Sequence, residues 1–291
     1  MKKSAERNIN RIRSQHPCFG SPGNKARIHL PVCPACNIEC GFCRRSLNGD
    51  ENRPGVSSAI LKPAEAVGQV DATLRVCGEL SVVGVAGPGD SLVGDGMFES
   101  LRAVGRAHPA LLKCISTNGL LLNERADELI ELGIDTLTVT VNAVDPDILS
   151  RIVLSVSYRG VRYEGNEGAR ILIENQLAGI RAMAKAGTVI KVNTVLIPGV
   201  NGAHIKEVAE TVASAGAMLY NIIPLIPQYV FVDFREPSCE EIDLARREAE
   251  KYIDVFRHCQ HCRADAIGIP GVSDYAAEVF RERAETVFSH G

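Results

Sequence analysis

Three cysteines with a fixed spacing lie near the N-terminal end of the chain, in the motif Cys36-x3-Cys40-x2-Cys43. Three thiolates this close together can hold an iron–sulfur cluster within one loop. A cubane cluster has four irons, so three cysteines leave one iron free to bind a small molecule. Electron-transfer clusters are usually held by four cysteines. The motif therefore predicts a cluster that performs chemistry on a bound ligand.

A second pair of cysteines, Cys259-x2-Cys262, has the spacing of a metal or cluster site. Two thiolates do not complete such a site, so further ligands must come from elsewhere in the chain. Zinc is an alternative, because zinc sites commonly combine two such pairs. Disulfides are not expected among the ten cysteines, because no apolar stretch follows Met1-Lys-Lys-Ser and no signal peptide is predicted. We expect a reducing, cytoplasmic location.

The composition excludes several classes of partner. The formal charge of −3 gives no electrostatic footprint for nucleic acid. No run approaches 18 apolar residues, so no membrane-spanning segment is expected. A length of 291 residues with 45% hydrophobic content is sufficient for one barrel with a sizeable core.

Short β-branched runs alternate with amphipathic runs along the chain. Glycines at 133, 187 and 216 follow helix-like runs, as C-caps do. Candidate strands cover residues 26–32, 80–86, 111–116, 135–141, 189–195 and 217–224. Candidate helices cover residues 63–76, 97–107, 124–132, 167–186, 203–215 and 240–256.

Six β/α repeats predict an α/β fold with a parallel sheet and right-handed crossovers. Six are too few for a closed eight-fold barrel, so a partial (βα)6 barrel of TIM type is expected. We expect three parts: an N-terminal extension at 1–25 carrying Cys18, the partial barrel at 26–256, and a C-terminal extension at 257–291 carrying Cys259 and Cys262.

Unusual residues follow the strands, where the chemistry of barrels is found. The second strand ends in a Gly-rich turn with Gly87, Pro88 and Gly89, which would let the backbone approach a ligand closely. An ordinary βα turn is the alternative. Polar residues in apolar strands need hydrogen-bond partners, which are either a ligand or other groups within the core. The polar residues of this kind are Ser116, Asn118, Asn142, Asn193 and, on the inward face of the first strand, His29.

The cysteine motif, placed after an apolar strand and with Phe42 before its last cysteine, resembles that of the radical S-adenosylmethionine (SAM) enzymes. The resemblance implies a partial barrel and a [4Fe–4S] cluster whose open iron chelates SAM. It implies reductive cleavage of SAM to a 5′-deoxyadenosyl radical. It also implies that the turn at Gly87, Pro88 and Gly89 contacts the SAM amino group.

Further motifs narrow the resemblance to the NifB family of nitrogenase cofactor assembly, in a short form without a NifX-like domain. They include His16-Pro-Cys-Phe19, Arg27-Ile-His-Leu-Pro-Val32, Glu51-Asn-Arg-Pro-Gly55, Ser116-Thr-Asn-Gly119, Tyr158-Arg-Gly-Val-Arg-Tyr163, Lys191-Val-Asn-x-Val-x-Ile-Pro-Gly199 and Arg257-His-Cys-x-x-Cys-Arg-Ala-Asp265.

This resemblance implies an unusual reaction. Two auxiliary [4Fe–4S] clusters are fused into an [8Fe–9S–C] precursor, the product called NifB-co. One SAM donates a methyl group to a cluster sulfide, and a second provides the radical that removes a methyl hydrogen. Sulfite is the expected source of the ninth sulfur. The implied partners are a cluster donor, a cofactor scaffold protein and an electron donor such as ferredoxin.

Carried over residue by residue, the resemblance implies that Cys36, Cys40 and Cys43 hold the SAM cluster. Auxiliary clusters would be held by Cys259 and Cys262 and by Cys18 and Cys114, with His29 as a further candidate ligand. The resemblance also implies catalytic roles for Cys114 and for Glu51, which is a candidate proton acceptor or cluster contact.

The chain departs from the family at Ser46-Leu-Asn-Gly-Asp50, where relatives usually carry another cysteine. One auxiliary cluster is therefore expected to have fewer protein ligands, and Cys33 is a candidate substitute. Three other functions are considered: a radical SAM enzyme with auxiliary clusters acting on an organic substrate, a non-catalytic iron–sulfur carrier, and a zinc-stabilised binding module.

Overall fold

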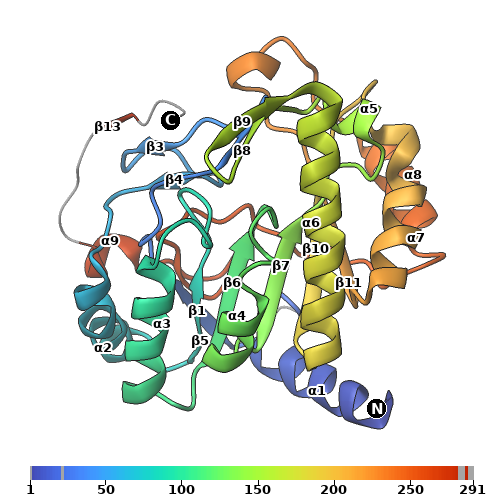
Figure 1. The fold of residues 1–291 in the computed structure, drawn as a ribbon. Coiled ribbons are helices and arrows are strands. Elements are labelled where there is room, and N and C mark those ends of the chain that lie inside the picture. Colours follow the sequence, from blue (N-terminus) through green and yellow to red (C-terminus); the bar gives the residue numbers. More distant parts are fainter. Residues whose placement is uncertain (1, 21–22, 281–285, 288–291) are drawn as a thin grey trace.

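A curled, seven-stranded sheet forms the centre of the molecule in this computed structural model, which describes residues 2–20, 23–280 and 286–287 (Figure 1). The strand order is β11-β10-β7-β6-β5-β1-β12, and all neighbours except β1 and β12 pair in parallel. The parallel strands are β1 (Ala26–His29), β5 (Leu80–Val85), β6 (Leu112–Thr117), β7 (Thr136–Thr140), β10 (Val189–Leu196) and β11 (Leu219–Pro224). The predicted partial barrel is confirmed.

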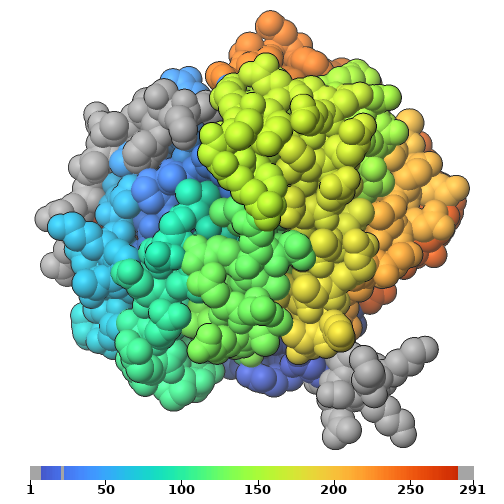
Figure 2. Space-filling view, in the orientation of Figure 1, coloured from blue at the N-terminus to red at the C-terminus, as the bar shows by residue number. Residues whose placement is uncertain are grey.

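Helices cover the convex side of this sheet, and packed side chains over α3, α4 and α6 close that face (Figures 1 and 2). Gly133, Gly187 and Gly216 adopt the left-handed conformation at three helix ends, as predicted. The helices are α2 (Ala66–Val76), α3 (Gly96–Ala107), α4 (Ala126–Leu132), α6 (Gly165–Ala186), α7 (Ile205–Ala215) and α8 (Cys239–Ala249).

Alternation along the strands separates an apolar face from a polar one. Ile28 and Leu30 lie in the main apolar core between sheet and helices. Arg27 and His29 point to the concave side, where Arg27 contacts Cys262. The concave side therefore receives the polar and cysteine side chains.

Several elements were not predicted. Helix α1 (Lys2–Gln15) crosses beneath the strands (Figure 1). A hairpin of β8 (Val153–Tyr158) and β9 (Val161–Glu164) pairs with β2 (Ile38–Cys40) of the cysteine loop. The segment after residue 256 contributes β12 (Ile267–Gly268), antiparallel to β1.

The remaining elements are short. They are β3 (Ser46–Leu47), β4 (Val56–Ser57), β13 (Thr286–Val287), α5 (Pro146–Leu149), α9 (Ala276–Val279) and the 3-10 turns Pro63–Glu65, Gly202–His204 and Tyr229–Phe231. Among the described helices, none is both long and apolar enough to cross a membrane.

Candidate active site

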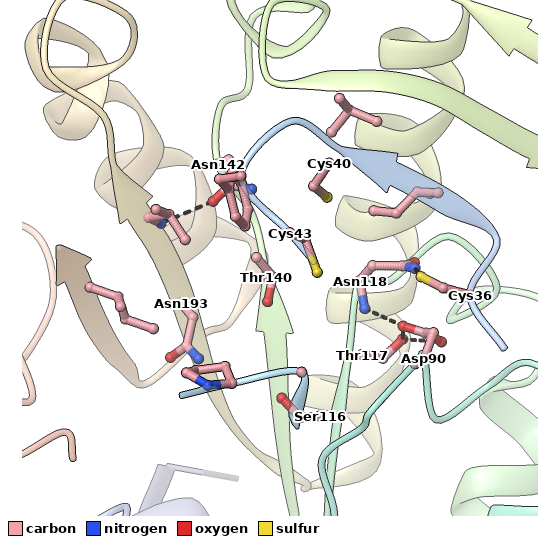
Figure 3. A pocket seen from close by; sticks show the side chains of 18 of the residues that line it. Cys36, Cys40, Cys43, Asp90, Ser116, Thr117, Asn118, Thr140, Asn142 and Asn193 are labelled. Atoms are coloured by element: carbon pink, nitrogen blue, oxygen red, sulfur yellow. Dashed lines mark hydrogen bonds between the residues drawn. The ribbon is translucent and has the colours of Figure 1, made fainter. Parts of the chain in front are cut away.

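A cavity of about 270 Å³ opens at the C-terminal ends of the parallel strands (Figure 3). The three cysteines of the loop line one side of it, and their sulfurs point into it. Most of the predicted SAM-binding residues line it too: Pro88, Gly89, Ser116, Asn118, Asn142 and Asn193. Gly87 lies in the same turn but does not line the cavity.

The loop cysteines are deeply placed. Burial, reinforced by the nearby Asp90 carboxylate, raises the pKa of the Cys36 thiol to about 11. Burial also raises the pKa of Cys40 and of Cys43. Without a metal these thiols are protonated at neutral pH, so binding a cluster must release protons.

The Gly-rich turn packs directly on the start of the cysteine loop. The Gly89 amide donates to the Cys33 carbonyl over 2.7 Å, and the Asp90 amide donates to the Ala35 carbonyl over 2.8 Å. A Cβ at Gly89 would lie 2.0 Å from the Ala35 oxygen. Only glycine permits this approach, so the turn fixes the loop that carries the cysteines.

Asp90 organises the end of β6. Its carboxylate accepts hydrogen bonds from the Thr117 hydroxyl at 2.9 Å and from the Asn118 amide at 2.5 Å. The Asn118 side chain donates to Asn37 Oδ1 at 2.7 Å and to the Cys36 sulfur at 3.7 Å (Figure 3). Burial raises the pKa of Asp90, although these hydrogen bonds oppose the effect. Asp90 thus connects the Gly-rich turn, β6 and the first cysteine.

Two asparagines form the opposite wall. Asn142 Oδ1 accepts a hydrogen bond from the Val195 amide at 2.9 Å, which fixes its side chain between β7 and β10. Asn193 Oδ1 accepts from the Asn221 amide group at 3.1 Å. Both side chains are therefore held by neighbouring strands while lining the cavity.

Four further cysteines gather deeper on the concave side, and we call them the lower cysteine group: Cys18, Cys114, Cys259 and Cys262. Cys18, Cys114 and Cys259 pack against one apolar cluster at the bottom of the sheet. The Cys18 thiol also lies in the electrostatic field of Cys262 and Cys114, and burial raises its pKa to about 12. The structure thus brings together cysteines from the N-terminal segment, β6 and the C-terminal segment.

Two histidines adjoin the lower cysteine group. The His29 ring contacts the Arg263 carbonyl through Nδ1 at 3.1 Å, and burial lowers its pKa to about 4. His16 Nδ1 accepts a hydrogen bond from the Cys18 amide at 3.1 Å, whereas its buried Nε2 has no partner. Burial lowers the pKa of His16 as well, so both rings are neutral. A neutral imidazole with an unpartnered nitrogen is a suitable metal ligand.

Neither Glu51 nor the Cys33 thiol lines the cavity or belongs to the lower cysteine group. Glu51 is exposed and does not line the cavity. It is bound by Arg53 at 2.6 Å and by Asn48 at 2.8 Å. Burial would raise its pKa, but the hydrogen bonds from Arg53, Asn48 and Ser46 lower it, so it is a weak proton acceptor. Cys33 is buried in the main core with its sulfur 3.8 Å from the Ser91 carbonyl, away from the lower cysteine group.

Three cations near the cysteines were not singled out from the sequence. Arg45 is buried, lines the cavity and donates to the Pro34 carbonyl. Arg27 and Lys191 are buried beside the lower cysteine group. The sequence signal that could have identified such cations is a charged residue within an apolar strand, as at Lys191.

Within the described residues, no three His, Cys, Asp or Glu side chains converge closely enough to hold a single metal ion. A cubane cluster instead needs thiolates spread around a cube. The loop cysteines fit this requirement, since all three face one cavity. The lower cysteine group, with the unpartnered His16 Nε2, also offers the donors that an iron–sulfur cluster takes.

Comparisons with known proteins agree with this geometry. The sequence profile of the radical SAM superfamily matches residues 30–212. A radical SAM methyltransferase from Sphaerobacter thermophilus shares the fold with a TM-score of 0.61 and 19% identity, over 83% of this chain and 70% of that one. SuiB from Streptococcus suis gives a TM-score of 0.59 at 10% identity, over 89% of this chain and 54% of that one. Fold and site together define a radical SAM enzyme.

Sequence relatives indicate the family within the radical SAM class. The FeMo cofactor biosynthesis protein NifB of Methanocaldococcus infernus is 46% identical over 272 residues, which cover 92% of this chain and 90% of that protein. The NifB protein of Klebsiella pneumoniae is 40% identical over 266 residues, 88% of this chain and 57% of that longer protein. The chain belongs to the NifB family of radical SAM enzymes.

Proposed function

We propose that this enzyme fuses two [4Fe–4S] substrate clusters and inserts a SAM-derived carbide, yielding the [8Fe–9S–C] precursor of the nitrogenase cofactor. The names of its relatives, FeMo cofactor biosynthesis proteins, support the pathway. The two groups of cysteines on one concave face support the reaction, because a methyl donor and its iron–sulfur acceptor must meet.

The observation that carries the proposal is the stacking of the two sites along shared strands. Cys114 and Ser116 lie two residues apart on the same face of β6, and so do Lys191 and Asn193 on β10. Ser116 and Asn193 line the cavity, whereas Cys114 and Lys191 belong to the lower layer. Two residues of a strand span about 7 Å. A substrate cluster at the lower cysteine group would lie directly beneath SAM.

In the cavity, Cys36, Cys40 and Cys43 would hold the resident [4Fe–4S] cluster. When bound, that cluster supplies the open iron that chelates SAM and the electron for its cleavage. Asn118, held by Asp90, keeps Cys36 in place, and the turn at Gly89 fixes the loop. Asn142 and Asn193 offer polar atoms to the rest of the SAM molecule, and the buried Arg45 offers a cation for its carboxylate.

Below the cavity, we assign Cys18, Cys114 and His16 Nε2 as ligands of one substrate cluster. Cys259 and Cys262 would hold the second, and the segment Ser46-Leu-Asn-Gly-Asp50 stands where relatives usually carry another cysteine. Ser46 is engaged in hydrogen bonds with Asn48 at 3.0 Å and Glu51 at 3.3 Å. The second cluster would therefore be held by few protein ligands, which suits a substrate that must move. Protein partners would be a cluster donor, a cofactor scaffold and a low-potential electron donor such as ferredoxin.

The test separates the two SAM reactions. Reconstituted protein with Cys18, Cys114, Cys259 and Cys262 all replaced by alanine should still cleave SAM to 5′-deoxyadenosine, since its loop cysteines are intact. It should lose S-adenosylhomocysteine formation, because the methyl acceptor is gone. Cys239→Ala, which removes an exposed cysteine, should keep both products. Undiminished S-adenosylhomocysteine in the quadruple variant would contradict the proposal and favour an organic methyl acceptor.

A further inference from the structure

Lys191 is a buried cation on the concave side of the sheet. It lies on β10 with 6% of its surface exposed. Its ammonium donates to the Cys18 carbonyl at 2.9 Å and lies between two aromatic rings, 4.7 Å from the centroid of Phe19 and 5.1 Å from that of Phe256. No carboxylate of the described residues forms a salt bridge with it.

Arg27 is a second such cation on the neighbouring side of the concave face. It is 5% exposed and donates to the Gly268 carbonyl at 2.5 Å and to the Cys262 sulfur at 3.1 Å. Its buried Nε has no partner. As with Lys191, no described carboxylate pairs with it. The lower cysteine group is thus bordered by two positive charges that form no salt bridge with any described carboxylate.

Burying a charge without a counter-ion costs several kcal/mol. Such a cost is offset when an anion occupies the site in the functional state. Thiolate-bound iron–sulfur clusters carry net negative charge, and their reduction potentials rise when positive charge or hydrogen bonds reach the cluster sulfurs. The placement of Lys191 and Arg27 beside four thiols matches this requirement.

We propose that Lys191, assisted by Arg27, supplies the fixed positive charge that retains an anionic iron–sulfur cluster at the lower cysteine group and raises its reduction potential. Lys191 is a positioning residue in this assignment and transfers no proton. The inference rests on the proposed function, since it requires a cluster at that place. Lys191 lies two residues below Asn193, and its ammonium contacts Phe19 and Phe256 of the apolar cluster beneath, so its charge reaches the cluster from the floor of the concave face.

The experiment uses full-length protein with Cys36, Cys40 and Cys43 replaced by alanine, so that only clusters below the cavity contribute signal. Iron per chain and the midpoint potential are measured by metal analysis and EPR-monitored redox titration. Lys191→Gln removes the charge, and Lys191→Arg keeps it. Lys113→Gln is the matched control, because Lys113 lies on the same sheet but donates to the Leu132 carbonyl on the convex side.

Lys191→Gln should lose iron and shift the potential downward by about 59 mV, a tenfold change in the one-electron equilibrium. Lys191→Arg and Lys113→Gln should behave like the parent. Equal potentials and equal iron retention in the Gln and parent proteins would overturn the inference. A loss in Lys191→Arg as large as that in Lys191→Gln would overturn it too, because shape rather than charge would be responsible.

Stability of the iron-free protein supplies a second readout. If the charge of Lys191 is neutralised only when an anionic cluster is bound, Lys191→Met should leave the unfolding midpoint of the iron-free protein unchanged or raised. A large fall would make Lys191 a structural residue and contradict the inference. Absence of any iron in the parent triple-alanine protein would instead contradict the proposed function itself, so the two failures are distinguishable.

Discussion

At the scale of single residues, Asp90 connects several parts of the cavity wall. Its buried carboxylate accepts hydrogen bonds from Leu92, Thr117 and Asn118. Asn118 in turn touches the Cys36 sulfur. This one carboxylate therefore accepts hydrogen bonds from both the Gly-rich turn and the end of β6. Its contribution to SAM binding is therefore indirect, through the position of Asn118 and the first cysteine.

Asp90→Asn should weaken SAM binding by about tenfold, because hydrogen bonds to a charged group contribute about 1.5–3 kcal/mol and an amide cannot accept all of them. The dissociation constant of SAM on reconstituted protein is the measurement, normalised to iron content. Asp95→Asn, at an exposed carboxylate paired with Arg125, is the control. An unchanged constant in Asp90→Asn would refute the role assigned to Asp90.

Asp265 joins the C-terminal segment to the loop at residues 46–58. It accepts from the Ser58 amide at 2.6 Å and from Arg263 Nε at 2.9 Å. Burial alone would raise its pKa, but these hydrogen bonds lower it. A lowered pKa means that its stabilising effect is complete above the unfolded value near 3.9 and is lost as pH falls through the folded value.

Asp265→Asn should lower stability at pH 7 by about 3 kcal/mol, the scale for breaking a buried charged pair. The equivalent substitution Glu128→Gln, at an exposed partner of Arg125, should lower stability by less than about 1 kcal/mol. Denaturant unfolding of both variants provides the comparison. Similar losses in the two would show that the Asp265 contacts contribute no more than a surface pair.

At the scale of elements, the turn after β5 and the cysteine loop form one unit. Two backbone amides of the turn donate hydrogen bonds to carbonyls of the loop, and glycine at position 89 allows the contact. Order in the cysteine loop therefore depends on a segment some fifty residues away in sequence, and the loop does not stand alone.

Gly89→Ala should disrupt this unit, since its Cβ would meet the Ala35 carbonyl. Overpacking of this kind costs about 1–3 kcal/mol, and the displaced loop should lose iron from the SAM cluster. Gly78→Ala is a suitable control, because nothing lies within 4 Å of a Cβ there. Iron content and unfolding midpoints are measured on both. Full iron occupancy in Gly89→Ala would disprove the dependence.

Local patterns predicted the parallel strands and their helices because each carries its own signal. Apolar β-branched runs mark buried strands, and glycines mark helix ends. Helix α1 gave no such signal, because residues 2–15 are mostly polar and only a few apolar side chains, such as Ile12, meet the core. The β8–β9 hairpin was missed because its partner β2 lies over a hundred residues earlier.

At the scale of the whole molecule, the concave face is layered. Apolar residues, including Ile12 and Phe256, form its floor. The lower cysteine group lies above them, and the cavity with Cys36, Cys40 and Cys43 opens at the top of the strands (Figure 3). This order supports a reaction in which SAM acts downward on a substrate held within the same barrel.

The cysteine ligands could be proposed from the sequence, but the residues that surround them in the fold could not be predicted. Motif spacing indicated the loop cysteines and the pair at 259 and 262. The positions of Cys18, Lys191 and Arg27 beside one another depend on α1 and on the C-terminal segment folding back to β1, contacts that no local pattern reports. Glu51 was singled out by motif, and the structure shows its carboxylate bound by Asn48 and by the buried Arg53.

The central claim is that SAM methylates a cluster held by the protein and that a second SAM then removes a hydrogen from that methyl group. The direct measurement uses reconstituted protein, a reductant and SAM with a trideuterated methyl group, with no organic substrate added. The account predicts S-adenosylhomocysteine together with deuterium in the 5′-deoxyadenosine. Deoxyadenosine without deuterium, and without S-adenosylhomocysteine, would contradict it.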